Sequence, residues 1–243
     1  MFDAPGMDVE MNQSLAAKAY EILKADIITC VLEPGRQIVQ SQLAEAYQIG
    51  TTPIREALQR LALEGFVQPI PRFGYVVSPI TFSDVREIFE LRSIVESAAA
   101  RLSAVRGSQE RLEQVLAGAD FGYVYRDRHS YVEFLARNVE FHRSVAKAAG
   151  NQRLVDLVSK FLDELTRVFH LGLDLRDSAE EMRDEHLALA RALCSRDPDR
   201  AEQIVQSQIA RSQNRVLEAL IRRLDGGTLG DLSGAVQVKR LDS

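Results

Sequence analysis

Residues 51–67 carry the stretch TTPIREALQRLALEGFV, which decides the fold of the N-terminal part of the chain. Apolar residues such as Ile54 and Leu58 recur in it at helical spacing and form one face of a helix. We expect a threonine to cap this helix, Pro53 to lie in its first turn, and Gly65 to end it. The opposite face offers four polar side chains suited to a DNA major groove: Thr51, Thr52, Arg55 and Gln59.

The segments on either side of this helix complete a known DNA-binding plan. Apolar periodicity predicts a helix over 14–29 and a shorter helix over 40–48. Two short apolar runs, at 66–67 and 75–77, are separated by prolines and a glycine and predict a hairpin. Two helices, a recognition helix and a hairpin make a winged helix-turn-helix, which we place over residues 13–79.

The predicted wing offers further DNA contacts, but the net charge of this part of the chain does not favour DNA binding. Arg72 and Gly74 at the tip of the hairpin can reach the DNA backbone or the minor groove. Residues 1–80, however, hold six Lys and Arg against nine Asp and Glu, so this part is net −3. A DNA-binding domain usually shows a basic surface, so binding must depend on a few well-placed arginines. The alternative is a small helical subdomain with a solvated polar face.

The rest of the chain predicts a mainly α fold. No alternating strand pattern persists, and the interpretation is an all-helical bundle for effector binding and dimerisation over 80–225, after a hinge at 79–83. Flexible tails are expected at 1–12 and 226–243. Six helical stretches are predicted in the bundle: 84–105, 108–127, 130–149, 151–172, 178–195 and 198–224.

Composition limits the class of protein. The 243 residues are 46% hydrophobic and 27% charged, with a formal net charge of −5. No segment approaches the roughly 20 apolar residues of a membrane helix, and the acidic N-terminus does not resemble a secretory signal. The two cysteines form no CxxC motif. We therefore expect a cytoplasmic protein with no membrane partner.

Five polar residues lie on the apolar faces of four predicted bundle helices: Arg92, Asn138, His142, His186 and Gln208. An unpaired polar group costs about 1–3 kcal/mol when it is buried, so five together indicate a polar cavity that binds an effector. Asn138, His142 and His186 offer the nitrogen and oxygen ligands of a divalent metal such as zinc. Arg92 can bind a small carboxylate effector in a two-pronged contact.

Other hypotheses remain open at this stage. The same polar residues can form a purely structural network that includes an Arg92–Glu96 pair. A metal-dependent helical enzyme with an accessory winged-helix domain is the alternative function, although GxSxG, GxxxxGK[ST], GxGxxG and HExxH are all absent from the sequence. A third hypothesis is a binding module that has lost its affinity for DNA.

The chain resembles the GntR family of bacterial regulators, in the FadR subfamily with an FCD-type ligand domain in its six-helix, VanR-like form. The resemblance runs from about Ser14 to Leu224. It is carried by LEPG at 32–35, TPIREALQRLALEGFV at 52–67, FGYVV at 73–77, ELR at 90–92 with Glu96, Asn138 and His142, GN at 150–151, and Glu185-His186.

This resemblance implies a homodimeric repressor on a short inverted repeat of double-stranded DNA, controlled by a small organic acid, with Thr52 and Arg55 as DNA contacts. The sequence departs from the family at three positions. Ser41 and Thr51 stand where arginines are expected, which predicts weaker or atypical operator binding. Gln208 stands where a third metal-binding histidine is expected, which predicts a weaker metal site.

Overall fold

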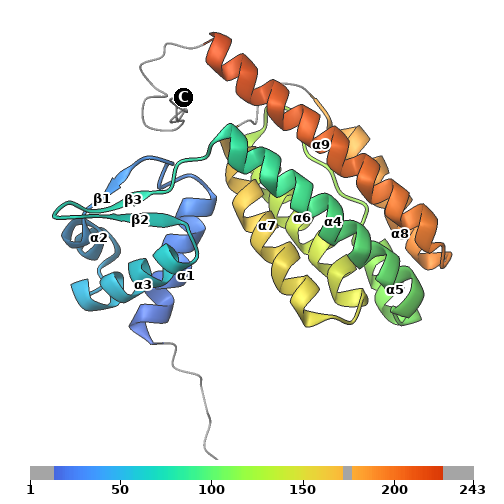
Figure 1. The fold of residues 1–243 in the computed structure, drawn as a ribbon, viewed down its shortest axis with the longest axis horizontal. Coiled ribbons are helices and arrows are strands. Elements are labelled where there is room, and N and C mark those ends of the chain that lie inside the picture. The colour runs from blue at the N-terminus through green and yellow to red at the C-terminus, as the bar shows by residue number, and fades with distance from the viewer. Residues whose placement is uncertain (1–13, 172–176, 227–243) are drawn as a thin grey trace, which may run out of the picture. The chain divides into compact units, whose positions relative to one another are not determined.

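A computed structural model describes residues 14–171 and 177–226 of the chain (Figure 1). It confirms the mainly α fold, with a small antiparallel sheet in the N-terminal part. Among the described residues, no helix is both long and apolar enough to span a bilayer. The predicted tails lie outside the described residues, apart from Gly226 at the end of the last helix.

The chain divides into two compact units, Met1–Pro79 and Ile80–Ser243. The N-terminal unit follows the order of a winged helix-turn-helix. Its elements are α1 (Leu15–Ile28), β1 (Gln37–Ile38), α2 (Gln40–Tyr47), α3 (Thr51–Leu63), β2 (Val67–Ile70) and β3 (Gly74–Val77).

Local sequence signals fix the ends of the N-terminal helices. The Ser14 side chain accepts a hydrogen bond from the Ala17 amide and caps α1. The prediction of a threonine cap for α3 is wrong, because Gly50 is the N-cap and Thr51 is already helical. The reason is that Pro53, with its preset backbone angle, lies in the first turn and leaves both threonines inside the helix.

The sheet contains one strand that the sequence pattern did not indicate. Strand β3 lies in the centre and pairs antiparallel with both β1 and β2, in the order β1-β3-β2. Strand β1 has only two residues, too few to show an alternating pattern. Ile38 is buried in the core beneath it, beside Val67 and Val77.

The C-terminal unit is a bundle of six helices in its described part, as predicted. The first of these helices begins with a capping box, in which Thr81 and Asp84 each bond the backbone amide of the other. The elements are α4 (Phe82–Arg106), α5 (Gln109–Ala117), α6 (Arg128–Ala148), α7 (Gln152–Leu171), α8 (Ala179–Cys194) and α9 (Pro198–Gly226).

The prediction of a long second bundle helix over 108–127 is wrong at its C-terminal end. Helix α5 ends at Ala117, and residues 118–127 form no helix. Gly118 and Gly122 weaken the helical conformation there. The irregular segment lets Phe121 enter the core, where it is 3% exposed and packs on Phe134. Burial of this ring outweighs the helical spacing that the sequence shows.

Candidate functional site

Helix α3 presents one apolar face inward and one polar face outward. Ile54, Leu58 and Leu61 are completely buried. The four polar residues predicted to contact DNA from this helix, Thr51, Thr52, Arg55 and Gln59, are all exposed on the opposite side. Glu56 is exposed beside them and would oppose an approaching phosphate. The helix therefore has the surface that a recognition helix needs, with one positive charge on it.

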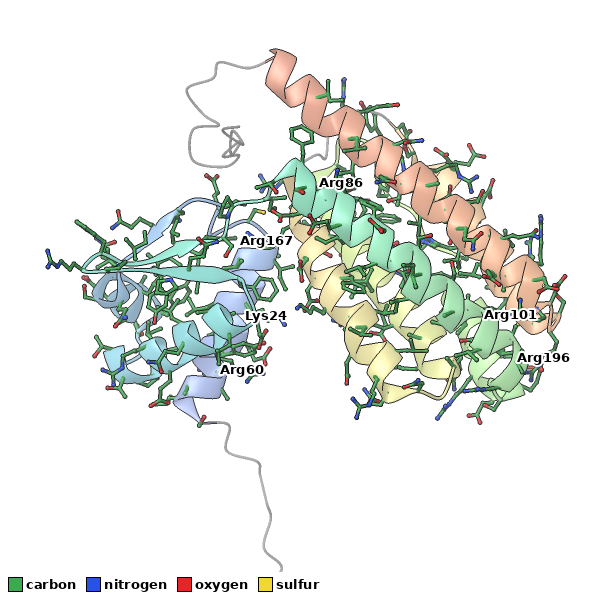
Figure 2. The ribbon with its side chains drawn as sticks, viewed as in Figure 1. Lys24, Arg60, Arg86, Arg101, Arg167 and Arg196 are labelled. Atoms are coloured by element: carbon green, nitrogen blue, oxygen red, sulfur yellow. The ribbon has the colours of Figure 1, made fainter. Side chains whose placement is uncertain are left out.

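Other cations of the N-terminal unit are already occupied within it. Glu64 accepts hydrogen bonds from Tyr20 at 2.7 Å and from Lys24 at 3.3 Å, and it pairs with Arg60 at 3.3 Å. The Arg60 guanidinium also stacks on the Tyr20 ring at 3.6 Å from its centroid. Figure 2 labels Lys24 and Arg60 on the same part of this unit. Both cations pair with Glu64, whereas Arg55 lies exposed nearer the start of α3, beside Thr51 and Thr52.

The turn between β2 and β3 places the two predicted wing residues differently. Arg72 is exposed at the tip, with a positive φ of 68°. Gly74 is half-buried, with a φ of 96°, and a Cβ atom at this position would lie 2.5 Å from the Ile38 carbonyl oxygen. The close approach of β1 therefore explains the glycine by itself, and its contact with DNA stays a prediction.

The five polar residues predicted on apolar helix faces all lie in the bundle core and line one cavity. They come from α4, α6, α8 and α9, and none is more than 9% exposed. The cavity leaves about 20 Å³ of free space, enough for about one water molecule or one ion. The five residues are Arg92, Asn138, His142, His186 and Gln208.

Glu96 joins two of these residues into a buried cluster. Its carboxylate pairs with Arg92 Nε at 2.5 Å and lies 2.9 Å from His142 Nδ1. Burial by itself would raise the pKa of Glu96, but the charges of Arg92 and His142 and their hydrogen bonds outweigh it and lower the pKa to about 2. Glu96 is therefore ionised at neutral pH and holds Arg92 and His142 in fixed positions. The Arg92–Glu96 pair in the structure is the one that the structural-network hypothesis required.

The cavity also holds buried polar atoms with no hydrogen-bond partner in the described part of the chain. These are Arg92 Nη1, His186 Nδ1, and both the oxygen and the nitrogen of the Gln208 amide. His186 stacks on the Phe121 ring at a centroid distance of 4.7 Å. Burial, and then the charges of His142 and Arg215, hold the pKa of His186 well below its usual value, so its imidazole is neutral. Such unpaired groups are costly unless something binds them.

Ion pairs between α8 and α9 border the same cavity. Glu185 is 9% exposed and pairs with Arg211, and it lies 3.5 Å from Arg215 Nη2. Arg215 Nη1 also lies 3.3 Å from Glu181. The sequence interpretation did not select Arg215 as a site residue. Its position seven residues after Gln208, on the same helix face, is the signal that identifies it.

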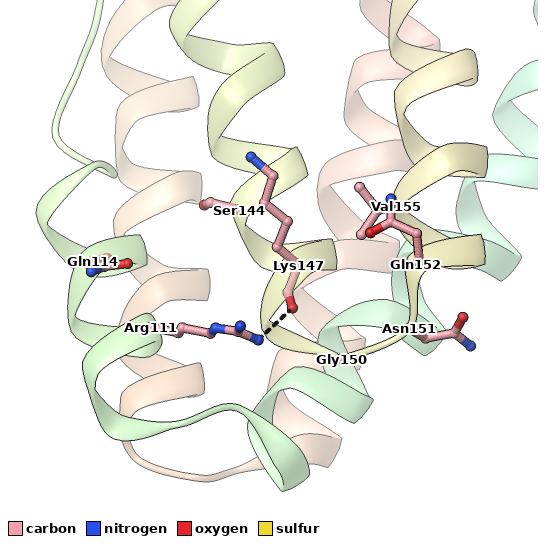
Figure 3. Close-up of a pocket in the computed structure, with 8 residues that line it drawn as sticks. All are labelled: Arg111, Gln114, Ser144, Lys147, Gly150, Asn151, Gln152 and Val155. Carbon is pink, nitrogen blue, oxygen red and sulfur yellow. Dashed lines mark hydrogen bonds between the residues drawn. The ribbon is translucent and has the colours of Figure 1, made fainter. Parts of the chain in front are cut away.

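A larger surface hollow of about 410 Å³ lies where α5 meets the turn between α6 and α7 (Figure 3). In this hollow Arg111 donates a 3.4 Å hydrogen bond to the Lys147 carbonyl near the end of α6. That bond caps the C-terminus of α6, and Lys147 itself pairs with Glu140 at 3.0 Å. The hollow contains none of the predicted site residues.

Comparisons with known proteins agree with both units. Residues 15–77 match the model of the gntR family of bacterial regulatory proteins. Residues 87–211, about half of the chain, match the model of the FCD domain. The chain belongs to the GntR family of bacterial regulators. The resemblance inferred from the sequence is confirmed, and the FCD domain is the bundle that contains the cavity.

Relatives across most of this GntR-family chain are named as transcription regulators. The repressor RspR of Escherichia coli strain K12 is 25% identical over 205 residues, which cover 84% of this chain and 90% of RspR. The probable repressor of the D-xylose utilisation operon of Paenarthrobacter nicotinovorans is 27% identical over 209 residues, or 81% of this chain and 86% of that protein. The chain is accordingly a DNA-binding transcription regulator and not an enzyme.

Solved structures show the same fold. A GntR regulator from Rhodococcus sp. RHA1 matches with a TM-score of 0.66 at 22% identity, covering 84% of this chain and 98% of that one. McbR/YncC of E. coli matches with a TM-score of 0.68 at 20% identity, covering 85% of this chain and 99% of that one.

Proposed function

We propose that this regulator is a repressor whose operator binding is controlled by a small carboxylate in the FCD cavity. The observation that carries the proposal is the set of unpaired polar atoms around that cavity, on Arg92, His186 and Gln208. A guanidinium and an amide NH₂ donate hydrogen bonds, and a carboxylate accepts them. A ligand of this class would accept hydrogen bonds from the unpaired donors, Arg92 Nη1 and the Gln208 nitrogen, whereas the Gln208 oxygen needs a donor or a cation.

A divalent metal fits the same residues. His142 and His186 would hold it, and Asn138 would add an amide oxygen. The contact between His142 Nδ1 and Glu96 leaves the second imidazole nitrogen available, as is usual for metal-binding histidines. The unpaired Nδ1 of His186 on a neutral imidazole also suits a ligand. When bound, the metal would supply positive charge for the effector carboxylate.

The size of the cavity determines what effector binding requires. The free space of about 20 Å³ accommodates an ion or a water molecule but not an organic acid. An acid must therefore separate helices that now touch, and the pairs of Arg215 with Glu181 and Glu185 hold α8 to α9 at this point. A carboxylate that competes with Glu185 for Arg215 would favour the opened state.

Control of DNA binding follows from linkage. An effector that prefers one conformation of the bundle shifts the chain toward it by the difference in its affinity for the two states. The operator must then change effector affinity by the same factor by which the effector changes operator affinity. Titrations of small mono- and dicarboxylic acids against the free protein and the protein–DNA complex check this equality.

The operator part is tested by selecting duplexes from a random DNA library and measuring their affinity by fluorescence anisotropy. We expect an inverted repeat, because two copies of α3 would read it. Arg55→Ala should weaken binding by about 1–3 kcal/mol per bound copy and leave the fold intact. Glu56→Ala is the control, because it removes an exposed neighbour with the opposite charge and should not weaken binding.

Wild-type affinity in the Arg55→Ala chain would contradict the assignment of α3 as the reading helix. A selection that returns no preferred sequence would instead favour a chain that has lost its affinity for DNA. Ser41 and Thr51, which stand where arginines are expected, make this second result informative. The salt dependence of the selected duplex then gives the number of phosphate contacts that remain.

A further inference from the structure

The turn between β2 and β3, which forms the tip of the wing, exposes an aromatic ring. Phe73 is 64% exposed, whereas every other phenylalanine among the described residues is buried or half-buried. Its neighbours Pro71 and Arg72 are exposed as well. In Figure 1 this turn projects from the N-terminal unit where the two strands join. A guanidinium and a phenyl ring therefore face solvent at adjacent positions of the wing.

Strand β1 holds this tip in one conformation. The Phe73 amide donates a 3.1 Å hydrogen bond to the Ile70 carbonyl and closes the turn. The Gln37 side chain of β1 donates a 3.2 Å bond to the Phe73 carbonyl. A side-chain atom at Gly74 would clash with the carbonyl of Ile38, the other residue of β1. Because the backbone makes these contacts, the exposed ring is not needed to keep the tip in place and is preorganised for a partner.

The charge of this unit makes an apolar DNA contact valuable. Residues 1–80 are net −3, and Arg55 and Arg72 are the cations predicted to reach DNA. Contacts between cations and phosphates release counterions, so a small number of them gives weak binding with a shallow salt dependence. Burial of an aromatic ring releases no counterions, and stacking of a base on such a ring changes affinity by about tenfold. Phe73 can therefore supply affinity that the charges do not.

The minor groove is the part of DNA that suits this pair of side chains. Proteins that bind there use arginine to read the groove and insert apolar side chains, phenylalanine among them, between base steps. An inserted ring partly unstacks the step, and pyrimidine–purine steps such as TA and CA are the easiest to unstack. A ring at the tip of the wing would thus read the flexibility of DNA without a hydrogen bond to any base.

We propose that Phe73 is a specificity-determining residue, which enters the minor groove beside Arg72 and selects a pyrimidine–purine step next to the bases that α3 reads. The inference rests on the proposed operator binding and adds a second way of reading sequence. Arg55 would recognise base edges in the major groove, whereas Phe73 recognises how easily the duplex unstacks. The contribution of Phe73 does not depend on salt, whereas that of Arg72 does.

Fluorescence anisotropy with the duplex that the full wild-type chain selects tests this inference. Phe73→Ala should weaken binding by about tenfold per bound copy and leave the slope of log affinity against log salt unchanged. Arg72→Gln should flatten that slope by about one unit per bound copy. Phe73→Leu keeps an apolar side chain that can insert and should retain most of the affinity.

Val31→Ala is the matched control, because Val31 is 59% exposed in the same unit but lies away from the tip. It precedes Gly35, whose amide bonds the Val77 carbonyl at the end of β3 that is far from the turn. This variant should bind like the wild type. 2-Aminopurine at the preferred step reports unstacking directly. Its fluorescence should rise when the wild-type chain binds and stay unchanged when Phe73→Ala binds.

Wild-type affinity in the Phe73→Ala chain would overturn the role of this ring. So would a preference for pyrimidine–purine steps that survives among the duplexes selected by that variant. In both cases the wild-type chain still binds its duplex and Arg55→Ala still loses affinity, so the proposed operator binding stands. A wild-type chain that binds no duplex overturns the inference and the operator part of the proposed function together.

Discussion

The two units of the chain distribute their polar side chains in opposite ways. Among residues 14–79, Ser78 is the only polar side chain that is buried, and the predicted DNA contacts of α3 all lie on the surface. The bundle instead lines one cavity with buried polar side chains that include Arg92, Asn138, His142, Glu185, His186 and Gln208. Glu96 is also buried and pairs with Arg92 and His142.

Because of this difference, substitutions at the proposed binding residues should affect folding stability in one unit and not in the other. In the winged helix-turn-helix, a change on the polar face of α3 should alter DNA binding with little effect on folding, because that face supports nothing beneath it. In the FCD domain, the residues that would bind an effector also fill the core. A change there should therefore alter binding and stability together.

The largest expected effect concerns whether the buried polar groups are a binding site. Protein purified without chelators should contain about one divalent ion per chain by elemental analysis, and His142→Ala should contain none. His129→Ala is the control, because the His129 side chain is 87% exposed and should leave the metal in place. A wild-type protein without metal would contradict the metal part of the proposal and leave Arg92 and Gln208 to bind the effector directly.

The next effect measures how much folding depends on the buried charges. Glu96→Ala leaves the Arg92 charge in the core without its partner and should reduce the free energy of unfolding by about 3–5 kcal/mol. Glu140→Ala breaks an ion pair that is more than half exposed, and should cost less than about 1 kcal/mol. Urea denaturation followed by circular dichroism compares the two. If both variants lose the same free energy of unfolding, the buried ion pair of Glu96 contributes no more to stability than an exposed one.

The smallest expected effect is a loss of stability at Gly74, a predicted DNA contact of the N-terminal unit that also has a structural role. Gly74→Ala forces a side chain into a positive φ and against the Ile38 carbonyl, which should cost about 1–3 kcal/mol. Gly65 has a φ of 85°, but no atom lies within 4 Å of the Cβ that Gly65→Ala would add. This control therefore measures the cost of the positive φ without the cost of a steric clash. Hydrogen exchange of peptides from 15–77 measures both. A Gly74→Ala cost no larger than that of Gly65→Ala would remove the structural explanation for Gly74.

Sequence patterns predicted the parts of the fold that depend on local periodicity. The apolar face of α3 and the polar residues on the inner faces of α4, α6, α8 and α9 follow from residue spacing alone. Strand β1 is too short for such a pattern, and α5 ends early because Phe121 packs on residues far along the chain. The contacts of Glu185 with Arg211 and Arg215 also join helices that are separate in sequence. Spacing along one element contains no information about such pairs.

The unpaired amide of Gln208 has a consequence for how the proposed metal site could change by mutation. Glutamine and histidine codons differ only in their third base, so a single transversion in the gene would put an imidazole at this point of the cavity. The cavity would then present three imidazoles, with His142 and His186 already in place. Under the proposed function, one base change at codon 208 would add a third imidazole to the site and should tighten metal binding.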